Sequence, residues 1–404
     1  MENKKNKIIG DMFLNLVSSL LLTSVLQLAV YPILSHNNLV SDFGNILTIT
    51  GICNAIGIMF GVSLNNLLLL KNNEFEREVI KSTFLKLTIT STILCLLISQ
   101  ISMLPFISFL KTNNYLIMTI YILLLMFRSF LTVFYRINLN YKLIVKHTII
   151  TSLGYLIGLF LYKILNIWGL IFFTGELFSL LFLLMTVPIK INKNDFYLPI
   201  NINIRNDFVN FFIASAIANL MLYLDRLLIN PILGASQVAV FFAASVIGKL
   251  LSLVMQPFSS VMLSYLSKEK VEDGYKIFKK SIFIASVSGA VFFCISFYLT
   301  PYLLNILYRD LYQDAMTIYV LCNVLAIINN MSVILQPLTL KFCPTSWQRS
   351  IQIIYCISYF CLSIILMRYF GLVGFIIGNI LSSIIKLFMI IILMIKYTKN
   401  IKEL

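Results

Sequence analysis

The chain has 404 residues, of which 59% are hydrophobic and only 12% are charged, and its formal net charge is +15. Ordinary soluble domains contain about 45–50% apolar and about 25% charged residues, so this composition excludes a typical soluble protein. The basic residues are spread over many loops between apolar runs, which argues against nucleic-acid binding. The sequence therefore predicts an all-α, polytopic membrane protein.

Twelve apolar runs follow one another along the chain, and most are long enough to cross a hydrocarbon core of about 30 Å as helices. They lie at about residues 8–34, 43–70, 84–110, 115–135, 147–162, 167–189, 208–233, 238–266, 281–308, 313–340, 350–367 and 371–395. Because most loops between these runs are short, we expect no separate catalytic domain and no enzymatic activity.

The basic residues alternate between the two sides of the predicted helices. Of the 31 Lys and Arg residues, 23 fall at the termini and in the loops of one side, and four fall in the loops of the other. Those four are Lys111, Lys163, Arg309 and Arg368. By the positive-inside rule, both termini and the longer loops are predicted to be cytoplasmic.

Four short segments of the first half recur in the second half, in the same order and at offsets of 196 to 202 residues. The pairs are Pro32–Leu34 with Pro231–Leu233, Leu104–Phe106 with Thr300–Tyr302, Met118–Tyr121 with Met316–Tyr319, and Trp168–Leu170 with Phe370–Leu372. This pattern predicts two six-helix lobes related by pseudo-two-fold symmetry around a central cavity, as in transporters built from parallel repeats. We place the N-terminal lobe at 1–190, a cytoplasmic linker at 191–207 and the C-terminal lobe at 208–404.

Six ionisable residues fall well inside the predicted spans, away from the span ends, where such residues are costly unless they find a partner or line a wet cavity. They are Arg128, Glu176, Asp225, Arg226, Lys249 and Lys386. A rise of about 1.5 Å per residue places Lys249 and Glu176 near the middle of the membrane, and Arg128 and Lys386 nearer the cytoplasmic side.

Lys249 shares one helical face with three polar residues, Ser245, Ser252 and Gln256, at −4, +3 and +7. The predicted substrate-binding residues are Lys249, Arg226, Arg128, Lys386, Ser245, Ser252, Gln256, Asn219 and Asn54. Asp225 and Glu176 are predicted to act in ion pairs or in coupling. The alternatives are structural ion pairs, snorkelling of Arg128 and Lys386 to the interface, neutralisation of a lysine by Glu176, and tight packing of small residues.

The segment from Tyr223 to Ala244 contains an Asp-Arg pair, a short Leu-Gly turn, and then aromatic and small residues. It resembles the signature of helices 7 and 8 in bacterial polysaccharide flippases of the multidrug/oligosaccharidyl-lipid/polysaccharide exporter superfamily, and Tyr369–Gly374 is similar to the start of their helix 12. The resemblance implies a protein of the bacterial cytoplasmic membrane that translocates undecaprenyl-diphosphate-linked oligosaccharide repeat units by alternating access, for O-antigen or capsule biosynthesis. It implies membrane lipids, a polysaccharide polymerase and other assembly proteins as partners, and no cofactor.

The charges agree with an anionic cargo, because Lys249 and Arg226 can hold a diphosphate by charge-assisted hydrogen bonds. An inside-negative potential also favours outward movement of an anion, by about 2.3 kcal/mol per charge per 100 mV.

Other functions remain as alternatives. An ion-coupled multidrug exporter of the same superfamily would be expected to carry an acid in the first span, and residues 14–34 contain none. A membrane-embedded polymerase or ligase would usually have a large outer loop. No metal site is predicted, because the chain has two histidines and no Cys-x-x-Cys pair among its seven cysteines.

Overall fold

The computed structural model describes residues 2–71, 78–187, 201–252, 255, 259 and 274–400. Every regular element in these ranges is a helix, as the composition predicts. The chain divides into two compact units. Unit 1 contains Met1–Asn38 and Asp42–Asn230, and unit 2 contains Leu39–Ser41 and Pro231–Leu404.

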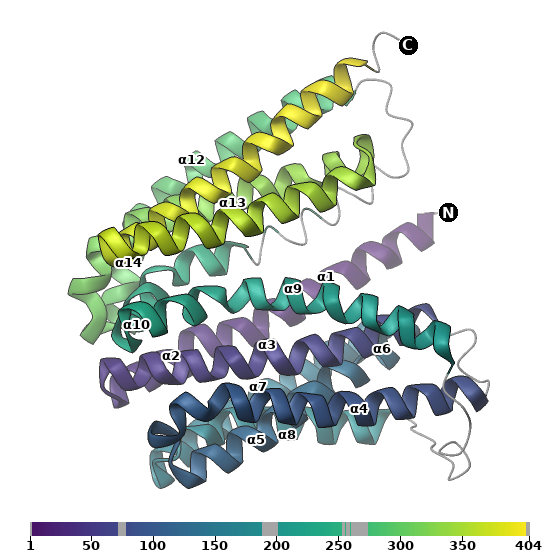
Figure 1. The fold of residues 1–404 in the computed structure, drawn as a ribbon, viewed down its shortest axis with the longest axis vertical. Coiled ribbons are helices and arrows are strands. Elements are labelled where there is room, and N and C mark those ends of the chain that lie inside the picture. The colour runs from purple at the N-terminus through teal and green to yellow at the C-terminus, as the bar shows by residue number, and fades with distance from the viewer. Residues whose placement is uncertain are drawn as a thin grey trace. The chain divides into compact units, whose positions relative to one another are not determined.

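Unit 1 is a helical bundle in which α7 packs closely on both α8 and α1, and α8 also packs on α5 (Figure 1). Its elements are α1 (Glu2–Val25), the π-helix η1 (Leu26–Val30), α2 (Tyr31–Asn37), α3 (Val40–Leu70), α4 (Glu78–Met103), the 3-10 helix η3 (Leu104–Phe106), α5 (Ile107–Leu131), α6 (Val133–Ile137), α7 (Tyr141–Leu165), α8 (Gly169–Thr186) and most of α9 (Ile202–Leu233). Of these, α3 is the most deeply buried span.

Unit 2 is built around α13, which packs against both α12 and α14 (Figure 1). Its elements are α10 (Ala235–Ala244), a short helix at Val246–Ser252, α12 (Gly274–Leu307), the 3-10 helix η5 (Arg309–Leu311), α13 (Tyr312–Phe342) and α14 (Thr345–Asn400). Phe278, Leu338, Ile351 and Ile390 belong to one core cluster, which joins α12, α13 and α14.

The described residues contain nine continuous helical stretches that are long and apolar enough to cross a membrane, and one bent pair of helices. Two of the nine stretches hold two spans each. The first turns at Lys111 (φ 48°), near the start of α5, and the second turns at Gly371 (φ 58°), within α14. Counted in this way, the spans number twelve, and the predicted all-α fold is confirmed.

The first helical segment, Glu2 to Asn37, extends beyond the predicted span 8–34 at both ends and changes its winding before Pro32. Proline has no amide hydrogen to donate one turn back, so a regular α-helix is interrupted there. The chain forms the π-helical turn Leu26–Val30 just before this point and then continues as α2 to Asn37. A proline and a π-helical turn are both common causes of a bend in a helix.

Three boundaries differ from the sequence expectation. The predicted span 238–266 is not one straight helix, because Ala235–Ala244 and Val246–Ser252 meet at 54°. Residues 202–207 of the predicted linker are helical, since the Asn201 side chain caps α9 by accepting from the amides of Asn203 and Ile204. By its contacts, α9 lies in unit 1 up to Asn230, whereas the sequence analysis placed 208–233 in the C-terminal lobe. The ancestral division into lobes stays a prediction.

Candidate functional site

A buried ion pair lies inside unit 1. Nε of Arg128, on α5, is 2.7 Å from Oε2 of Glu176, on α8, and the Glu176 side chain is fully buried. The hydroxyl of Tyr155, on α7, donates to the other carboxylate oxygen of Glu176 at 2.8 Å. A guanidinium and a phenol from two different helices therefore engage both oxygens of one carboxylate.

Aromatic rings surround the helical turn before this carboxylate. Phe172 lies one turn before Glu176 on α8, and the rings of Tyr31, Tyr121 and Tyr155 lie 6.4, 5.8 and 6.4 Å from its ring. These tyrosines come from α2, α5 and α7. Since all four rings are almost completely buried, they separate the ion pair from water on that side.

Glycines allow α7 and α8 to approach closely enough for the Tyr155 contact. A Cβ at Gly175 would lie 2.7 Å from the Tyr155 ring, and one at Gly154 would lie 2.8 Å from the carbonyl oxygen of Thr174. Both distances are shorter than real Cβ contacts allow. The small residues thus set the position of the phenol that binds Glu176.

Asn54, a predicted ligand on α3, belongs to the same buried region of unit 1. Its Oδ1 accepts a hydrogen bond from the Tyr121 hydroxyl at 2.8 Å. Tyr121 in turn lies near enough to Glu176 to interact with it electrostatically. The structure therefore brings Asn54, Arg128 and Glu176 into one polar region, through tyrosines that the sequence analysis did not select.

Arg226 forms a second polar contact within unit 1, between α9 and α3. Its side chain is 7% exposed, and one terminal nitrogen donates to the carbonyl oxygen of Leu47 at 3.0 Å. The guanidinium carbon also lies 5.6 Å from the centre of the Tyr223 ring. Gly51 makes room for this arrangement, since a Cβ there would be 3.2 Å from Cδ of Arg226.

Three other polar residues of α9 form hydrogen bonds, of which the one from Asn230 also reaches α3. Asn230 donates to the Thr48 hydroxyl at 2.7 Å, one helical turn after Arg226. Asp225 accepts from the backbone amide of Arg226 at 2.8 Å. Asn219 is buried and donates to the carbonyl of Ser215 in its own helix at 2.8 Å.

Lys249 lies in unit 2, just after the bend between the two helices of the broken pair. Its ammonium group is 4.7 Å from the centre of the Phe242 ring and 5.7 Å from that of Phe241. Such distances are typical of cation–π interactions. The ammonium group is therefore held against aromatic rings.

The predicted polar stripe around Lys249 is present in part. The Lys249 amide donates to the Ser245 carbonyl at 3.1 Å, so helical spacing continues across the bend. The hydroxyls of Ser245 and Ser252 donate to the backbone carbonyls of Phe242 and Gly248. Gln256 lies outside the described residues.

Lys386 is placed in the second half of α14, also in unit 2. Its ammonium group lies 4.9 Å from the centre of the Tyr355 ring, which comes from the first half of the same helix. The contact joins the two spans on either side of Gly371.

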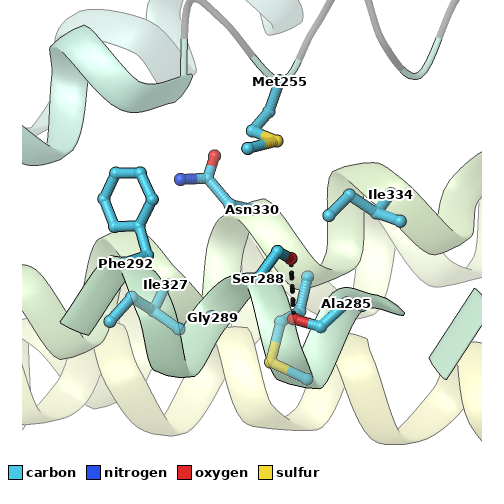
Figure 2. A pocket seen from close by; sticks show the side chains of 9 residues that line it. Met255, Ala285, Ser288, Gly289, Phe292, Ile327, Asn330 and Ile334 are labelled. Atoms are coloured by element: carbon cyan, nitrogen blue, oxygen red, sulfur yellow. Dashed lines mark hydrogen bonds between the residues drawn. The ribbon is translucent and has the colours of Figure 1, made fainter. Parts of the chain in front are cut away.

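A small hollow of about 10 Å³, room for about one water molecule, lies between α12, α13 and Met255 in unit 2 (Figure 2). Ser288, Phe292 and Ile327 line it, and the Asn330 side chain points toward Met255. Oδ1 of Asn330 is buried and accepts no hydrogen bond from the described residues. A buried acceptor in a hollow of this kind is usually satisfied by water or by a bound hydroxyl group. Asn330 was not among the residues predicted from the sequence to bind substrate.

Solved structures with a similar fold are transporters. An inward-facing multidrug resistance MATE family transporter of the MOP superfamily is 16% identical, with a TM-score of 0.64 over 93% of this chain and 95% of that one. An outward-facing MATE structure is 14% identical, with a TM-score of 0.60 over 97% and 96% of the two chains. A MATE in complex with MaD5 is 15% identical, with a TM-score of 0.62 over 97% and 96%. No family model and no curated protein matches the sequence. The similarity establishes a MATE-like fold.

Proposed function

We propose that this chain is a membrane exporter that works by alternating access, and that its cargo is an anionic amphiphile. The flippase resemblance of Tyr223–Ala244 narrows this cargo to undecaprenyl-diphosphate-linked oligosaccharide repeat units. The MATE-like fold supports the transport mechanism, because proteins built from two such lobes carry cargo by rocking one lobe against the other.

The observation that best supports an anionic cargo is that the two carboxylates within the spans already have partners in the protein. Glu176 binds Arg128 and Tyr155, and Asp225 accepts the amide of Arg226. Away from the ends of the predicted spans lie four basic residues and these two acids, so the formal charge in the span interiors is positive. This balance disfavours a cationic cargo, which would need an exposed carboxylate, and favours a diphosphate.

A multidrug exporter is the second candidate, and the solved structures favour it because their own descriptions name multidrug resistance transporters. Under this alternative, Lys249 and Lys386 lie against rings that would also contact an aromatic drug.

A clean deletion of the gene, in a strain without a redundant exporter, tests both candidates. For the flippase, we expect lipid-linked repeat units to accumulate on the cytoplasmic leaflet and surface polysaccharide to be lost, with drug susceptibility unchanged. Increased susceptibility to several unrelated drugs, together with normal surface polysaccharide, would reject the flippase and favour the multidrug exporter.

A further inference from the structure

The contacts of Glu176 lead to an inference about the driving force, which rests in part on the proposed function. A carboxylate inside a membrane bundle needs a positive partner or a proton, because an isolated charge is costly there. An exchangeable Na⁺ or H⁺ could meet this need, and its exchange would then couple transport to an ion gradient. At Glu176, however, the positive partner is Arg128, a covalent part of the chain, at 2.7 Å.

The geometry around Glu176 holds this partner in place. The carboxylate is fully buried, its second oxygen accepts from Tyr155, and the Arg128 side chain is largely buried. Arginine keeps its charge at all accessible pH values, so the pair cannot be opened by losing the cation's proton.

Besides Cys53 on α3, which lies near Tyr121, the other ionisable groups near the pair come from four helices. They are Tyr31 on α2, Tyr121 on α5, Tyr155 and His147 on α7, and Tyr223 on α9. His147 is itself buried and hydrogen-bonded to Ser179 on α8 at 2.6 Å. Within the described residues, the group near Glu176 that carries a permanent positive charge is the Arg128 guanidinium.

We propose that Arg128 is a resident counter-ion of Glu176, which takes the place of an exchangeable cation, so that unit 1 completes the transport cycle without H⁺ or Na⁺ binding at Glu176. For an anionic cargo, the inside-negative membrane potential then supplies the driving force.

The first test measures ion binding by thermal unfolding and needs no substrate. The midpoint temperature of thermal unfolding of the purified wild type should not change when NaCl replaces choline chloride at constant ionic strength. It should also be the same at pH 6 and at pH 8. In Arg128→Met the carboxylate has lost its partner, so Na⁺ or low pH should raise the midpoint by about 2–4 °C. Arg128→Met with Glu176→Gln should lose this response.

The same measurement can overturn the proposal. A saturable rise in the wild-type midpoint with Na⁺ or H⁺ that disappears in Glu176→Gln would show that Glu176 binds an exchangeable cation despite Arg128. If Arg128→Met does not fold, this comparison of wild type with Glu176→Gln still decides the question. Arg128→Lys serves as the matched control, since it keeps the charge and should stay insensitive to both ions.

The second test uses transport in membrane vesicles with a lipid-linked substrate. Collapse of the membrane potential with valinomycin and K⁺ should stop export, whereas collapse of the pH gradient with nigericin should leave it unchanged. The opposite result would overturn the proposal. Absence of any export under all conditions would instead count against the proposed function, and the unfolding result would stand independently.

Discussion

Nε of Arg128 and Oε2 of Glu176 lie 2.7 Å apart in the interior of unit 1, although the two residues are nearly fifty positions apart in the sequence. Loss of one partner of a buried pair leaves an uncompensated charge, at a cost of about 3–5 kcal/mol. We therefore expect Arg128→Gln and Glu176→Gln each to lower the thermal midpoint and the yield of folded protein.

The double variant Arg128→Gln, Glu176→Gln should be more stable than the sum of the single effects predicts, because no charge is left unpaired. Tyr155→Phe removes one hydrogen bond to the carboxylate and should cost about 1–3 kcal/mol. Thermal unfolding of the wild type and the four variants in the same detergent measures these differences. Additive effects of the two glutamine substitutions would contradict a direct interaction.

Gly175 provides a test of the packing that positions Tyr155. In Gly175→Ala the new Cβ would lie 2.7 Å from the Tyr155 ring, so we expect a loss of about 1–3 kcal/mol in the free energy of unfolding. Gly10→Ala is a matched control in α1, because nothing lies within 4 Å of a Cβ there. Equal midpoints for the two variants would argue against close packing of α7 on α8.

The spans could be predicted from the sequence because their length and apolar character are local properties of the chain. The turn at Lys111 falls where the predicted spans 84–110 and 115–135 are separated. The bend at Ser245 could not be predicted, since the apolar run continues through it. The membership of α9 in unit 1 depends on contacts such as Arg226 with Leu47, which no local pattern reveals.

The charged candidate residues could be predicted because charges are easily recognised in apolar runs. Their interaction partners could not be predicted from the sequence. The number of residues from the helix ends placed Arg128 nearer the cytoplasmic side of the membrane than Glu176. The long arginine side chain can bridge a helical turn of about 5.4 Å, so the two groups can still meet. The alternative in which Glu176 neutralises a lysine does not hold, because its partner in the ion pair is Arg128. Tyr155 was missed because tyrosines were counted as apolar, although the glycines at 154 and 175 mark the close approach of its helix.

The membrane topology can be tested at the end of α2. Asn37 is exposed, and the distribution of basic residues predicts that it lies outside the cell. In a background without other reactive cysteines, Asn37→Cys should react with an impermeant thiol reagent on intact cells. Asn194→Cys, outside the described residues, should react only after permeabilisation. The reverse labelling pattern would invert the topology.

Cys343 should react slowly in the folded protein. It follows the last residue of α13, and burial raises the pKa of its thiol to about 11. Because the thiolate is the reactive form, roughly one thiol in a thousand is reactive at pH 8, and the alkylation rate should rise about tenfold per pH unit up to about pH 11. Peptide mass mapping after timed alkylation measures this rate. Rapid alkylation at pH 8 without denaturant would contradict the buried position.

Lys249 is the best candidate for holding an anionic cargo, because it lies on a broken span beside Phe241 and Phe242. Lys249→Ala should abolish export while protein levels in the membrane stay unchanged. Lys249→Arg should retain part of the activity, since the charge remains while its geometry changes.

A suitable control is Lys279→Ala, because Lys279 also lies over an aromatic ring, at 4.8 Å from the centre of Tyr275, but is exposed near the start of α12. A solvent-exposed cation–π contact such as this one contributes only about 0.5–1 kcal/mol to stability. The Lys279→Ala variant should therefore still export. Accumulation of lipid-linked substrate measures export in all three variants. If Lys249→Ala exports as well as Lys279→Ala, the ammonium group of Lys249 does not hold the cargo, and its contact with Phe242 serves to stabilise the bend.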